Sequence, residues 1–323
     1  MLNVALIGIG NIGLLFDTNK SDYNTAYSHI KAIYLHKNLN LKYVVDIDTK
    51  YKKLIKDFFP NVKFYTNYKK LIPKTDIDIL TIATPTATHF SILNSFQDNK
   101  NIKIFFIEKP LFQLKSQYKI LPKNITDKIV INYPRRFDDA IKNIKKNIKN
   151  TKIEKIVINY CKGLKNNGSH LIDMINLIFD KPKIIEKKIL ATSDKFDDND
   201  LTYDIFVKIK YQNKIIPLYF ISHNHTKYNL IKLEIYTQKQ KIEYDNSSSS
   251  INYFNIINHP TFPTYKIFDT KANYCDKVNG ALHILNAYKH IINVINKNIK
   301  IISSYKDEIA NMKFYYTLTK DSK

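Results

Sequence analysis

The segment that most constrains the fold lies at the amino terminus, where an apolar run at residues 3–7 leads directly into Gly8-Ile9-Gly10-Asn11-Ile12-Gly13. Glycine is rare in this chain, with six among 323 residues, and three of the six fall within this turn. In such a turn the first glycine permits the bend, the second lets the backbone approach a pyrophosphate, and the third allows close packing of helix on strand. The helix N-terminus would then face the anion. The turn therefore predicts a dinucleotide-binding site.

The first part of the chain alternates short apolar runs with amphipathic stretches, which is the pattern of a parallel sheet covered by helices. Strands are predicted at residues 3–7, 41–47, 62–65, 77–83, 104–107 and 128–132. Helices are predicted at residues 24–36, 50–58 and 88–96, where apolar residues recur every three or four positions. Six strands fit one dinucleotide-binding domain, which we place at residues 1–134.

After this domain the pattern changes to a second domain of α+β type at residues 135–323. A Lys-rich helix at residues 138–149 leads into strands at residues 153–160, 201–211, 215–222 and 230–237. Further helices are predicted at residues 171–179 and 280–296. A C-terminal helix of this kind could also pack back on the first domain.

The second predicted strand ends in Val44-Val45-Asp46-Ile47-Asp48. A carboxylate at this strand tip accepts hydrogen bonds from the adenine ribose hydroxyls and repels a 2′-phosphate, so Asp46 favours NAD over NADP. Asp46 lies further from Gly13 than the usual interval of about 20 residues. We therefore expect residues 16–25 to form an insertion. A loop acid or helix cap is the alternative interpretation of Asp46.

The formal net charge of +22 raises the possibility of nucleic-acid binding. Only Arg135 and Arg136 among the 51 basic residues are arginine, however, and the lysines are scattered along the whole chain. Because arginine supplies the planar fork of base and phosphate recognition, a nucleic-acid binder this basic would use more of it. The charge favours anionic ligands instead, and we expect no nucleic-acid partner.

The cysteine content and hydropathy indicate a cytoplasmic protein. The two cysteines, Cys161 and Cys275, are too few for a disulfide framework and match no metal-ligand spacing. His223 and His225 have no nearby cysteine or acid to complete a metal site, so no metal is expected. The start of the chain lacks a basic targeting region, and no stretch approaches the roughly 18 apolar residues of a membrane span.

Further segments complete a resemblance to the Gfo/Idh/MocA family of sugar oxidoreductases. In chain order they are Ala83-Thr84-Pro85-Thr86-Ala87-Thr88-His89, Glu108-Lys109-Pro110, Asn132-Tyr133-Pro134-Arg135-Arg136-Phe137 and a Gly-Ser-His segment. The resemblance implies an α/β Rossmann domain, followed by an α+β domain with a large, mostly antiparallel open sheet. It also implies a homo-oligomer assembled through that sheet, and a cleft between the domains where nicotinamide and substrate meet.

The family resemblance also implies roles for the residues that end strands four and five. Thr84, Pro85 and His89 would line the cofactor, and Glu108 would contact it. Lys109 would lie near both nicotinamide and substrate. A lysine at a strand tip inside a cleft can donate a hydrogen bond to the reacting hydroxyl or stabilise its developing oxyanion.

A second catalytic element is predicted at Asn166-Asn167-Gly168-Ser169-His170, which resembles the family's Asp-x-Gly-x-His. His170 is the natural general base, because an imidazole titrates near neutral pH. Asn166 stands where the family usually has aspartate and carries no charge, which puts a complete acid-base triad in doubt. A helix-capping or pairing role for His170 and Asp173, three residues apart, is the alternative.

Two lysines just before this element, Lys162 and Lys165, suit a phosphorylated substrate. We hypothesise that one of them contacts the diphosphate of a nucleotide sugar. Arg136 follows strand six and could clamp cofactor or substrate, with a structural salt bridge as an equal alternative.

The sequence thus favours an NAD-dependent oxidoreductase that acts on a hydroxyl or keto carbon of a sugar, such as a nucleotide sugar of surface-glycan biosynthesis. Lys109 would polarise the oxygen and His170 would exchange its proton. The competing hypothesis, which Asn166 motivates, is a catalytically silent NAD-binding sensor or scaffold. Nucleic-acid binding ranks third.

Overall fold

The structure is a computed structural model that describes residues 1–18, 24–197 and 200–320. Its chain forms two compact units. Unit 1 consists of Met1–Phe137 and Gly280–Ile309, and unit 2 of Asp138–Asn279 and Ala310–Lys323. This division differs from the two consecutive domains expected from sequence because the segment from Gly280 returns to unit 1. The physical reason is that its apolar residues, including Ile284, Tyr288 and Ile291, complete the core of unit 1.

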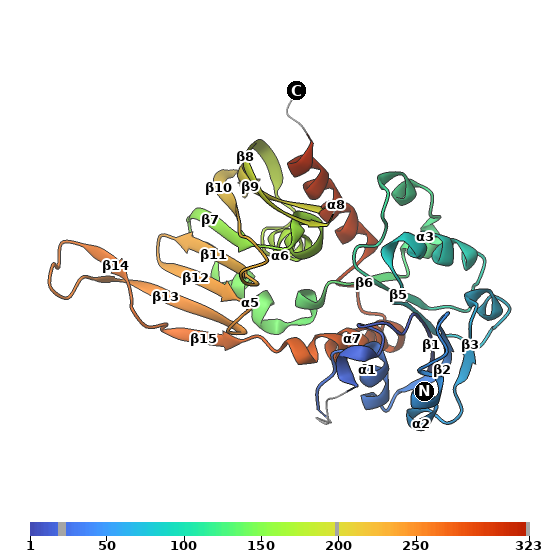
Figure 1. The fold of residues 1–323 in the computed structure, drawn as a ribbon. Helices are drawn as coiled ribbons and strands as arrows, with labels where there is room; N and C mark the ends of the chain where they lie inside the picture. Colours follow the sequence, from blue (N-terminus) through green and yellow to red (C-terminus); the bar gives the residue numbers. More distant parts are fainter. Residues whose placement is uncertain (19–23, 198–199, 321–323) are drawn as a thin grey trace. The chain divides into compact units, whose positions relative to one another are not determined.

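Unit 1 is built on a six-stranded parallel sheet in the order β3-β2-β1-β4-β5-β6 (Figure 1). The strands are β1 (Leu2–Ile7), β2 (Leu39–Val45), β3 (Lys63–Tyr65), β4 (Ile79–Ile82), β5 (Ile104–Glu108) and β6 (Ile129–Asn132). All six predicted strands are confirmed. The strand order reverses between β1 and β4, and ligands of such sheets bind at the carboxyl ends of the strands beside that point.

Helices α1, α2 and α7 contribute apolar residues to the core that contains the sheet of unit 1. The α-helices are α1 (His29–Leu35), α2 (Lys52–Phe58), α3 (Thr86–Ser95), α4 (Lys123–Thr126) and α7 (His283–Lys297). Short 3₁₀ helices lie at Leu15–Asp17, Tyr68–Leu71, Lys115–Lys119, Pro134–Phe137 and Gly280–Leu282.

The helix expected directly after the glycine turn is interrupted. The Leu14 N–H donates to the Gly10 carbonyl at 2.9 Å, which completes one helical turn. The chain then leaves the helix and rejoins it at α1, where the N–H of His29 donates to Ile12 at 2.9 Å and that of Ile30 donates to Gly13 at 3.0 Å. The described ends of the predicted insertion, residues 16–18 and 24–25, fall within this interruption of the helix, while its residues 19–23 lie outside the described part of the chain.

The ends of this insertion are joined by Asp17. Its carboxylate Oδ2 accepts hydrogen bonds from the backbone N–H of Tyr27 at 2.8 Å and from the N–H and hydroxyl of Ser28 at 2.6 and 2.7 Å. The Ser28 hydroxyl in turn caps α1 by accepting from the Lys31 N–H. Capping of this kind satisfies N–H groups that have no partner inside the helix, so it fixes where α1 begins.

Unit 2 is built on a nine-stranded sheet in the order β14-β13-β12-β11-β7-β10-β9-β8, with β15 paired to β13. Only β7 and β10 pair in parallel, so the predicted, mostly antiparallel sheet is confirmed. The strands are β7 (Ile153–Tyr160), β8 (Lys183–Asp197), β9 (Asp200–Tyr211), β10 (Lys214–Ser222), β11 (Ile231–Thr237), β12 (Gln240–Asp245), β13 (Ser250–Asn258), β14 (Lys266–Phe268) and β15 (Tyr274–Lys277).

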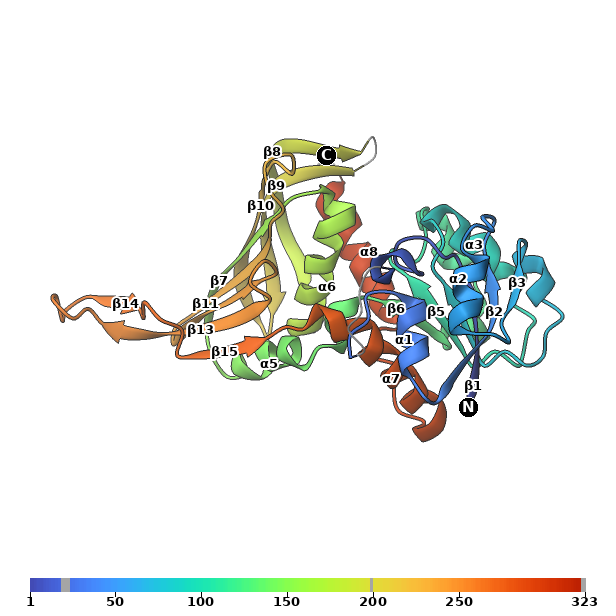
Figure 2. The same ribbon diagram turned by 60° about the horizontal axis from the view of Figure 1, so that its bottom comes forward.

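One face of this sheet is covered by α5 (Asp139–Asn147) and α6 (Gly168–Ile178), and β13 and β14 extend beyond it as a hairpin (Figure 2). A π-helical turn at Gly163–Asn167 leads straight into α6. The sequence analysis did not predict β8. This strand is rich in charged residues and pairs with one neighbour, β9, at the sheet edge, so it lacks the apolar alternation of a half-buried strand.

The last helix, α8 (Tyr305–Thr319), was also not predicted, because its apolar residues are not gathered on one face. It begins with a reciprocal cap in which the Ser304 N–H and hydroxyl donate to the Asp307 carboxylate at 2.9 and 2.7 Å, while the Asp307 N–H donates to the Ser304 hydroxyl at 3.3 Å. Residues up to Ile309 belong to unit 1, and the rest of the helix belongs to unit 2.

Within the described ranges, no helix combines the length and the apolar character that crossing a membrane requires. In the same residues, no three metal-ligating side chains of the His, Cys, Asp or Glu type gather into one group.

Candidate functional site

The glycine turn closes tightly against the end of β4. Gly8 has a φ of +94°, which L side chains rarely adopt, and a Cβ there would lie 2.7 Å from the backbone of Ala83. A Cβ on Gly13 would lie 2.4 Å from the Gly8 carbonyl oxygen. Both glycines are therefore required by the protein itself, because each leaves room for a neighbouring stretch of backbone.

Gly10 differs from the other two glycines of the turn. No protein atom lies within 4 Å of the position that its Cβ would take, and Gly10 and Asn11 are exposed. Among the described residues, no acceptor receives the backbone N–H of Asn11 or Ile12. Open space beside N–H donors at the tip of β1 fits the pyrophosphate of a dinucleotide. The expected long helix is replaced by a single turn, so the N–H groups and not an extended helix dipole provide the attraction.

Asp46 follows β2 directly and joins it to the glycine turn. Its Oδ2 accepts a hydrogen bond from the Ile9 N–H at 2.7 Å, and its Oδ1 accepts from the Asp48 N–H at 2.9 Å. These bonds orient the carboxylate and leave further lone pairs on both oxygens for ribose hydroxyls. The side chain thus has a structural role in the turn in addition to the predicted contact with the ribose.

The end of β4 is followed by Thr84, which is half-buried, and Pro85, which is exposed. His89 links this segment to the segment after β5. The buried imidazole places Nε2 2.8 Å from the Thr84 carbonyl oxygen and Nδ1 3.1 Å from that of Leu111. Burial has the largest effect on the pKa of His89 and lowers it, outweighing the two carbonyls and the charge of Glu108. His89 therefore braces two loops, and its contact with the cofactor stays a prediction.

Glu108 ends β5 within a buried polar network. Its Oε1 accepts hydrogen bonds from His29 Nε2 at 3.0 Å and from Asn132 Nδ2 at 2.7 Å. With Nε2 donating, His29 Nδ1 can accept from the Tyr288 hydroxyl at 3.1 Å, which lies 3.0 Å from the Thr81 hydroxyl. Burial alone would raise the pKa of the Glu108 carboxyl, but His29, Asn132 and Lys109 outweigh it and lower that pKa. The carboxylate is therefore kept charged directly beside Lys109.

Lys109, the predicted substrate-side residue, occupies the turn after β5 and is half-buried. Neighbouring parallel strands β1, β4 and β5 bring their carboxyl ends to the same edge of the sheet. This edge carries the glycine turn, Thr84 and the Glu108–Lys109 turn. The predicted unit 1 residues therefore lie on one sheet edge.

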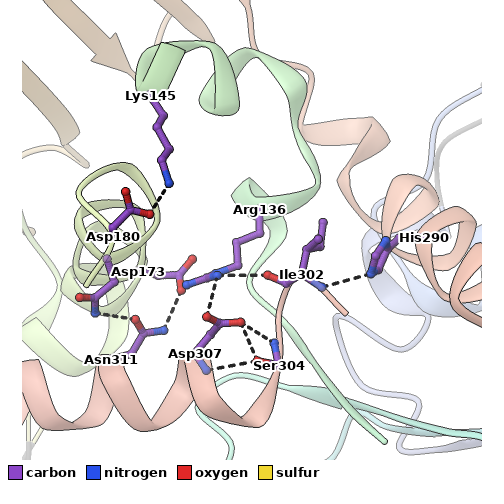
Figure 3. A network of polar contacts seen from close by, with 10 residues as sticks. Arg136, Lys145, Asp173, Asp180, His290, Ile302, Ser304, Asp307 and Asn311 are labelled. Atoms are coloured by element: carbon purple, nitrogen blue, oxygen red, sulfur yellow. Dashed lines mark hydrogen bonds and ion pairs between the residues drawn. The ribbon is translucent and has the colours of Figure 1, made fainter. Parts of the chain in front are cut away.

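Arg136, a predicted substrate clamp, is buried and contacts Ile302 and Asp307 of unit 1 (Figure 3). Its Nη1 donates to the Ile302 carbonyl at 3.1 Å and lies 3.5 Å from Asp307 Oδ1. Through these contacts Arg136 has a structural role, because it binds the residues at the start of α8. A role in substrate binding stays a prediction.

The predicted residues Lys162, Lys165, Asn166 and His170 all belong to unit 2 and are half-buried. Lys162 has a left-handed backbone with a φ of +60°, and the π-helical turn that follows carries Lys165 and Asn166. His170 lies in the first turn of α6. Further along α6, the buried Asp173 accepts a hydrogen bond from Asn311 Nδ2 at 2.7 Å (Figure 3).

Asp200, a buried carboxylate at the start of β9, was not predicted from the sequence. Its Oδ1 and Oδ2 accept from the N–H groups of Lys165 and Asn166 at 2.7 and 2.8 Å. A Cβ on Gly163 would lie 2.0 Å from Asp200 Oδ2, so this glycine is needed for the contact. Asp200 thus supplies a negative charge to the backbone at Asn166, whose own side chain has none. No local motif marks Asp200, because it reaches this turn only through the pairing of the sheet.

The three glycines give a direct test of the cofactor site. Gly10→Ala has room in the protein, so we expect unchanged thermal stability but NADH binding weaker by about tenfold, or about 1.4 kcal/mol. Gly13→Ala overlaps the Gly8 carbonyl, so we expect a loss of stability of about 1–3 kcal/mol or more. Thermal melts and NADH fluorescence titration measure both effects. Unaltered NADH affinity in Gly10→Ala would contradict a pyrophosphate beside this turn.

The lowered pKa of His89 makes stability depend on pH. The unfolded chain takes up a proton on this imidazole near pH 6.5, whereas the folded chain does so only at lower pH, so stability falls as pH drops below about 6.5. We expect His89→Gln to make the urea midpoint less dependent on pH between about pH 5 and pH 8. His36, whose pKa is also lowered by burial, leaves part of the dependence in place. His259→Gln in unit 2 serves as the control, and an equal dependence in His89→Gln and the unmodified chain would refute the assignment.

Comparison with solved structures shows that this fold recurs. A proposed myo-inositol dehydrogenase from Sinorhizobium meliloti 1021 matches with a TM-score of 0.70 and 18% identity, over 98% of this chain and 96% of that one. A super-repressor mutant of Gal80p from Saccharomyces cerevisiae matches with a TM-score of 0.73 and 14% identity, over 98% and 94% of the two chains. At such low identity these similarities show the fold alone.

Among curated proteins, an uncharacterised protein of Plasmodium falciparum is 24% identical over 255 residues, which are 74% of this chain. The match spans 15% of the length of that protein. A family model described as an oxidoreductase family with an NAD-binding Rossmann fold matches residues 2–123, which hold the glycine turn, Asp46, Thr84 and Glu108–Lys109. The model is that of the Gfo/Idh/MocA family, and the part of this chain similar to it is the NAD-binding Rossmann domain, which is less than half of the 323 residues.

Proposed function

We propose that this protein is an NAD-dependent dehydrogenase or reductase that acts on a hydroxyl or keto carbon of a sugar. The observation that carries the proposal is the position of Lys109, which directly follows Glu108 at the sheet edge that also bears the glycine turn. A cation at this edge can hold and polarise a substrate oxygen. The name of the Sinorhizobium relative, a proposed dehydrogenase of a cyclic polyol, supports a ring hydroxyl as the reacting group.

The chemistry that NAD supplies when bound is hydride exchange at its nicotinamide ring. The chain's own part is to bind the cofactor with the turn at Gly10 and with Asp46, and to hold the substrate oxygen with Lys109. We propose that His170 exchanges the proton of that oxygen, since a neutral imidazole can accept it near pH 7. Asp46 supports NAD over NADP, because its carboxylate would repel a 2′-phosphate.

We further propose a nucleotide sugar of surface-glycan biosynthesis as the substrate, in a cytoplasmic homo-oligomer. Lys162 and Lys165 support an anionic substrate, as does the positive net charge. The outer face of the sheet in unit 2 supports association, because it alternates aromatic and charged side chains such as Tyr236, Lys232 and Glu243. Two free cysteines agree with a reducing compartment.

The second candidate is an NAD-binding sensor or scaffold without turnover. Asn166 favours it, because this side chain cannot share a proton with a neighbour. The likeness of the fold to a super-repressor mutant of Gal80p is consistent with a regulatory member of this fold. The two candidates differ in one measurable property, which is turnover.

Lys109→Ala tests the enzyme hypothesis. With NAD and a panel of sugars and nucleotide sugars, we expect turnover by the unmodified chain and a fall in kcat/KM of about 10²- to 10³-fold in the variant, because the oxyanion loses its donor. NADH affinity should persist, and Lys69→Ala, an exposed lysine of unit 1, should behave as the unmodified chain. His170→Gln should remove the acidic limb of the kcat/KM–pH profile. Tight NADH binding without turnover on any substrate would favour the sensor.

The substrate class is tested by removing the two positive charges before α6. We expect Lys162→Gln with Lys165→Gln to raise KM for a nucleotide sugar by about threefold to tenfold and to leave KM for a neutral sugar unchanged. The exposed pair Lys149→Gln and Lys183→Gln controls for net charge. If KM changes equally for both substrates, or for neither, these lysines do not bind a diphosphate.

A further inference from the structure

A buried carboxylate outside the sequence motifs contacts the turn that carries Lys109. Glu308, in the first turns of α8, is 2% exposed. Its Oε1 accepts hydrogen bonds from the Leu111 N–H at 3.2 Å and from the Tyr118 hydroxyl at 2.8 Å, and its Oε2 accepts from the Tyr133 hydroxyl at 2.7 Å. Every residue of this cluster belongs to unit 1. Leu111 lies two residues after Lys109, so the carboxylate acts on the same turn.

The peptide groups of Leu111 are held from both sides. Glu308 accepts the Leu111 N–H, while the Leu111 carbonyl faces Nδ1 of the buried His89 at 3.1 Å. The next N–H, that of Phe112, donates to the Tyr118 hydroxyl at 3.3 Å, and this hydroxyl donates onward to Glu308. Two successive backbone N–H groups after Lys109-Pro110 are therefore linked to one carboxylate, directly or through one hydroxyl.

The position of Glu308 is itself fixed by its surroundings. The cap formed by Ser304 and Asp307 sets the start of α8 at Tyr305, three residues before Glu308. Ser303, which precedes the cap, binds the edge of the sheet, because its carbonyl accepts the Ile131 N–H at 2.9 Å. Arg136 forms an ion pair with Asp307 (Figure 3). A carboxylate anchored through a helix cap and a sheet edge is a rigid acceptor.

We propose that Glu308 is a positioning residue that sets the backbone of the Lys109 turn and thereby the place of the Lys109 ammonium group. A merely space-filling side chain would not need charge, and burying a carboxylate is costly unless donors satisfy it. Here three donors do so, and one of them is the backbone of the turn itself. The expected effect of Glu308 on turnover rests on the proposed role of Lys109. Its expected effect on the position of the Lys109 ammonium group does not.

The first test does not depend on turnover. Lys109 is labelled with a limiting amine-reactive reagent, and its labelling rate is measured by peptide mass spectrometry, with the exposed Lys69 as internal reference. We expect Glu308→Ala to change the relative rate at Lys109 several-fold. Glu308→Gln, which keeps an acceptor for the Leu111 N–H, should fold and show a smaller change in the same direction. Circular dichroism and NADH affinity confirm folding, and if the alanine variant does not fold, the glutamine variant decides the result.

Tyr133→Phe is the matched control, because it removes one hydrogen bond from Glu308 and keeps those that Glu308 accepts from Leu111 and Tyr118. We expect it to lower stability and leave the Lys109 labelling rate unchanged. An equal labelling change in Tyr133→Phe and Glu308→Gln would mean general loosening and would overturn the proposal. Unaltered labelling in both Glu308 variants would overturn it as well.

A double-mutant cycle provides the second test if a substrate is turned over. Glu308→Ala should lower kcat by about 10- to 100-fold in the unmodified background, as a displaced catalytic group does, and should have little further effect in Lys109→Ala. An equal loss in both backgrounds would show that Glu308 does not act through Lys109. Absence of turnover in every form would refute the proposed enzyme function, while the labelling result would still decide the role of Glu308.

Discussion

The carboxylate of Glu108 is the interaction on which the sheet edge of unit 1 depends. It ends β5 and accepts hydrogen bonds from His29 at the start of α1 and from Asn132 at the end of β6. Through His29 and Tyr288 the same network reaches Thr81 in β4 and the helix α7. A half-buried carboxylate loses part of its hydration, and these partners replace it, so the network links three strands and two helices. Lys109 follows directly from this anchored position.

The interrupted helix after the glycine turn explains why His29 can serve this network. Residues between Leu14 and His29 leave the helix and return to it, and the N–H of His29 then donates to Ile12 as if the helix were continuous. Hydrogen bonds from α1 to Ile12 and Gly13 are therefore kept across the insertion. The proposed cofactor site therefore consists of the exposed N–H groups near Gly10 and of Asp46, which itself accepts a hydrogen bond from the Ile9 N–H.

In unit 2, a comparable carboxylate organises the turn before α6. Asp200 accepts the N–H groups of Lys165 and Asn166, and Gly163 leaves the space it occupies. Residue 166 is an asparagine without charge, but a carboxylate, that of Asp200, accepts its backbone N–H. Two buried acids that no motif marks, Asp200 and Glu308, thus hold the turns that carry the residues proposed for chemistry.

The sequence by itself determined the six parallel strands, the glycine turn, the acid at Asp46 and the insertion before it, because each follows from local periodicity or from spacing along the chain. It also placed Glu108 and Lys109 at a strand end. Only the tertiary structure decided that Gly280–Ile309 belongs to unit 1, that His89 and Arg136 bond to carbonyls of the protein, and that Asp200 and Glu308 contact the candidate turns. These contacts join residues far apart in the chain. Such pairings depend on how sheets and helices pack, and no local pattern of residue types encodes them.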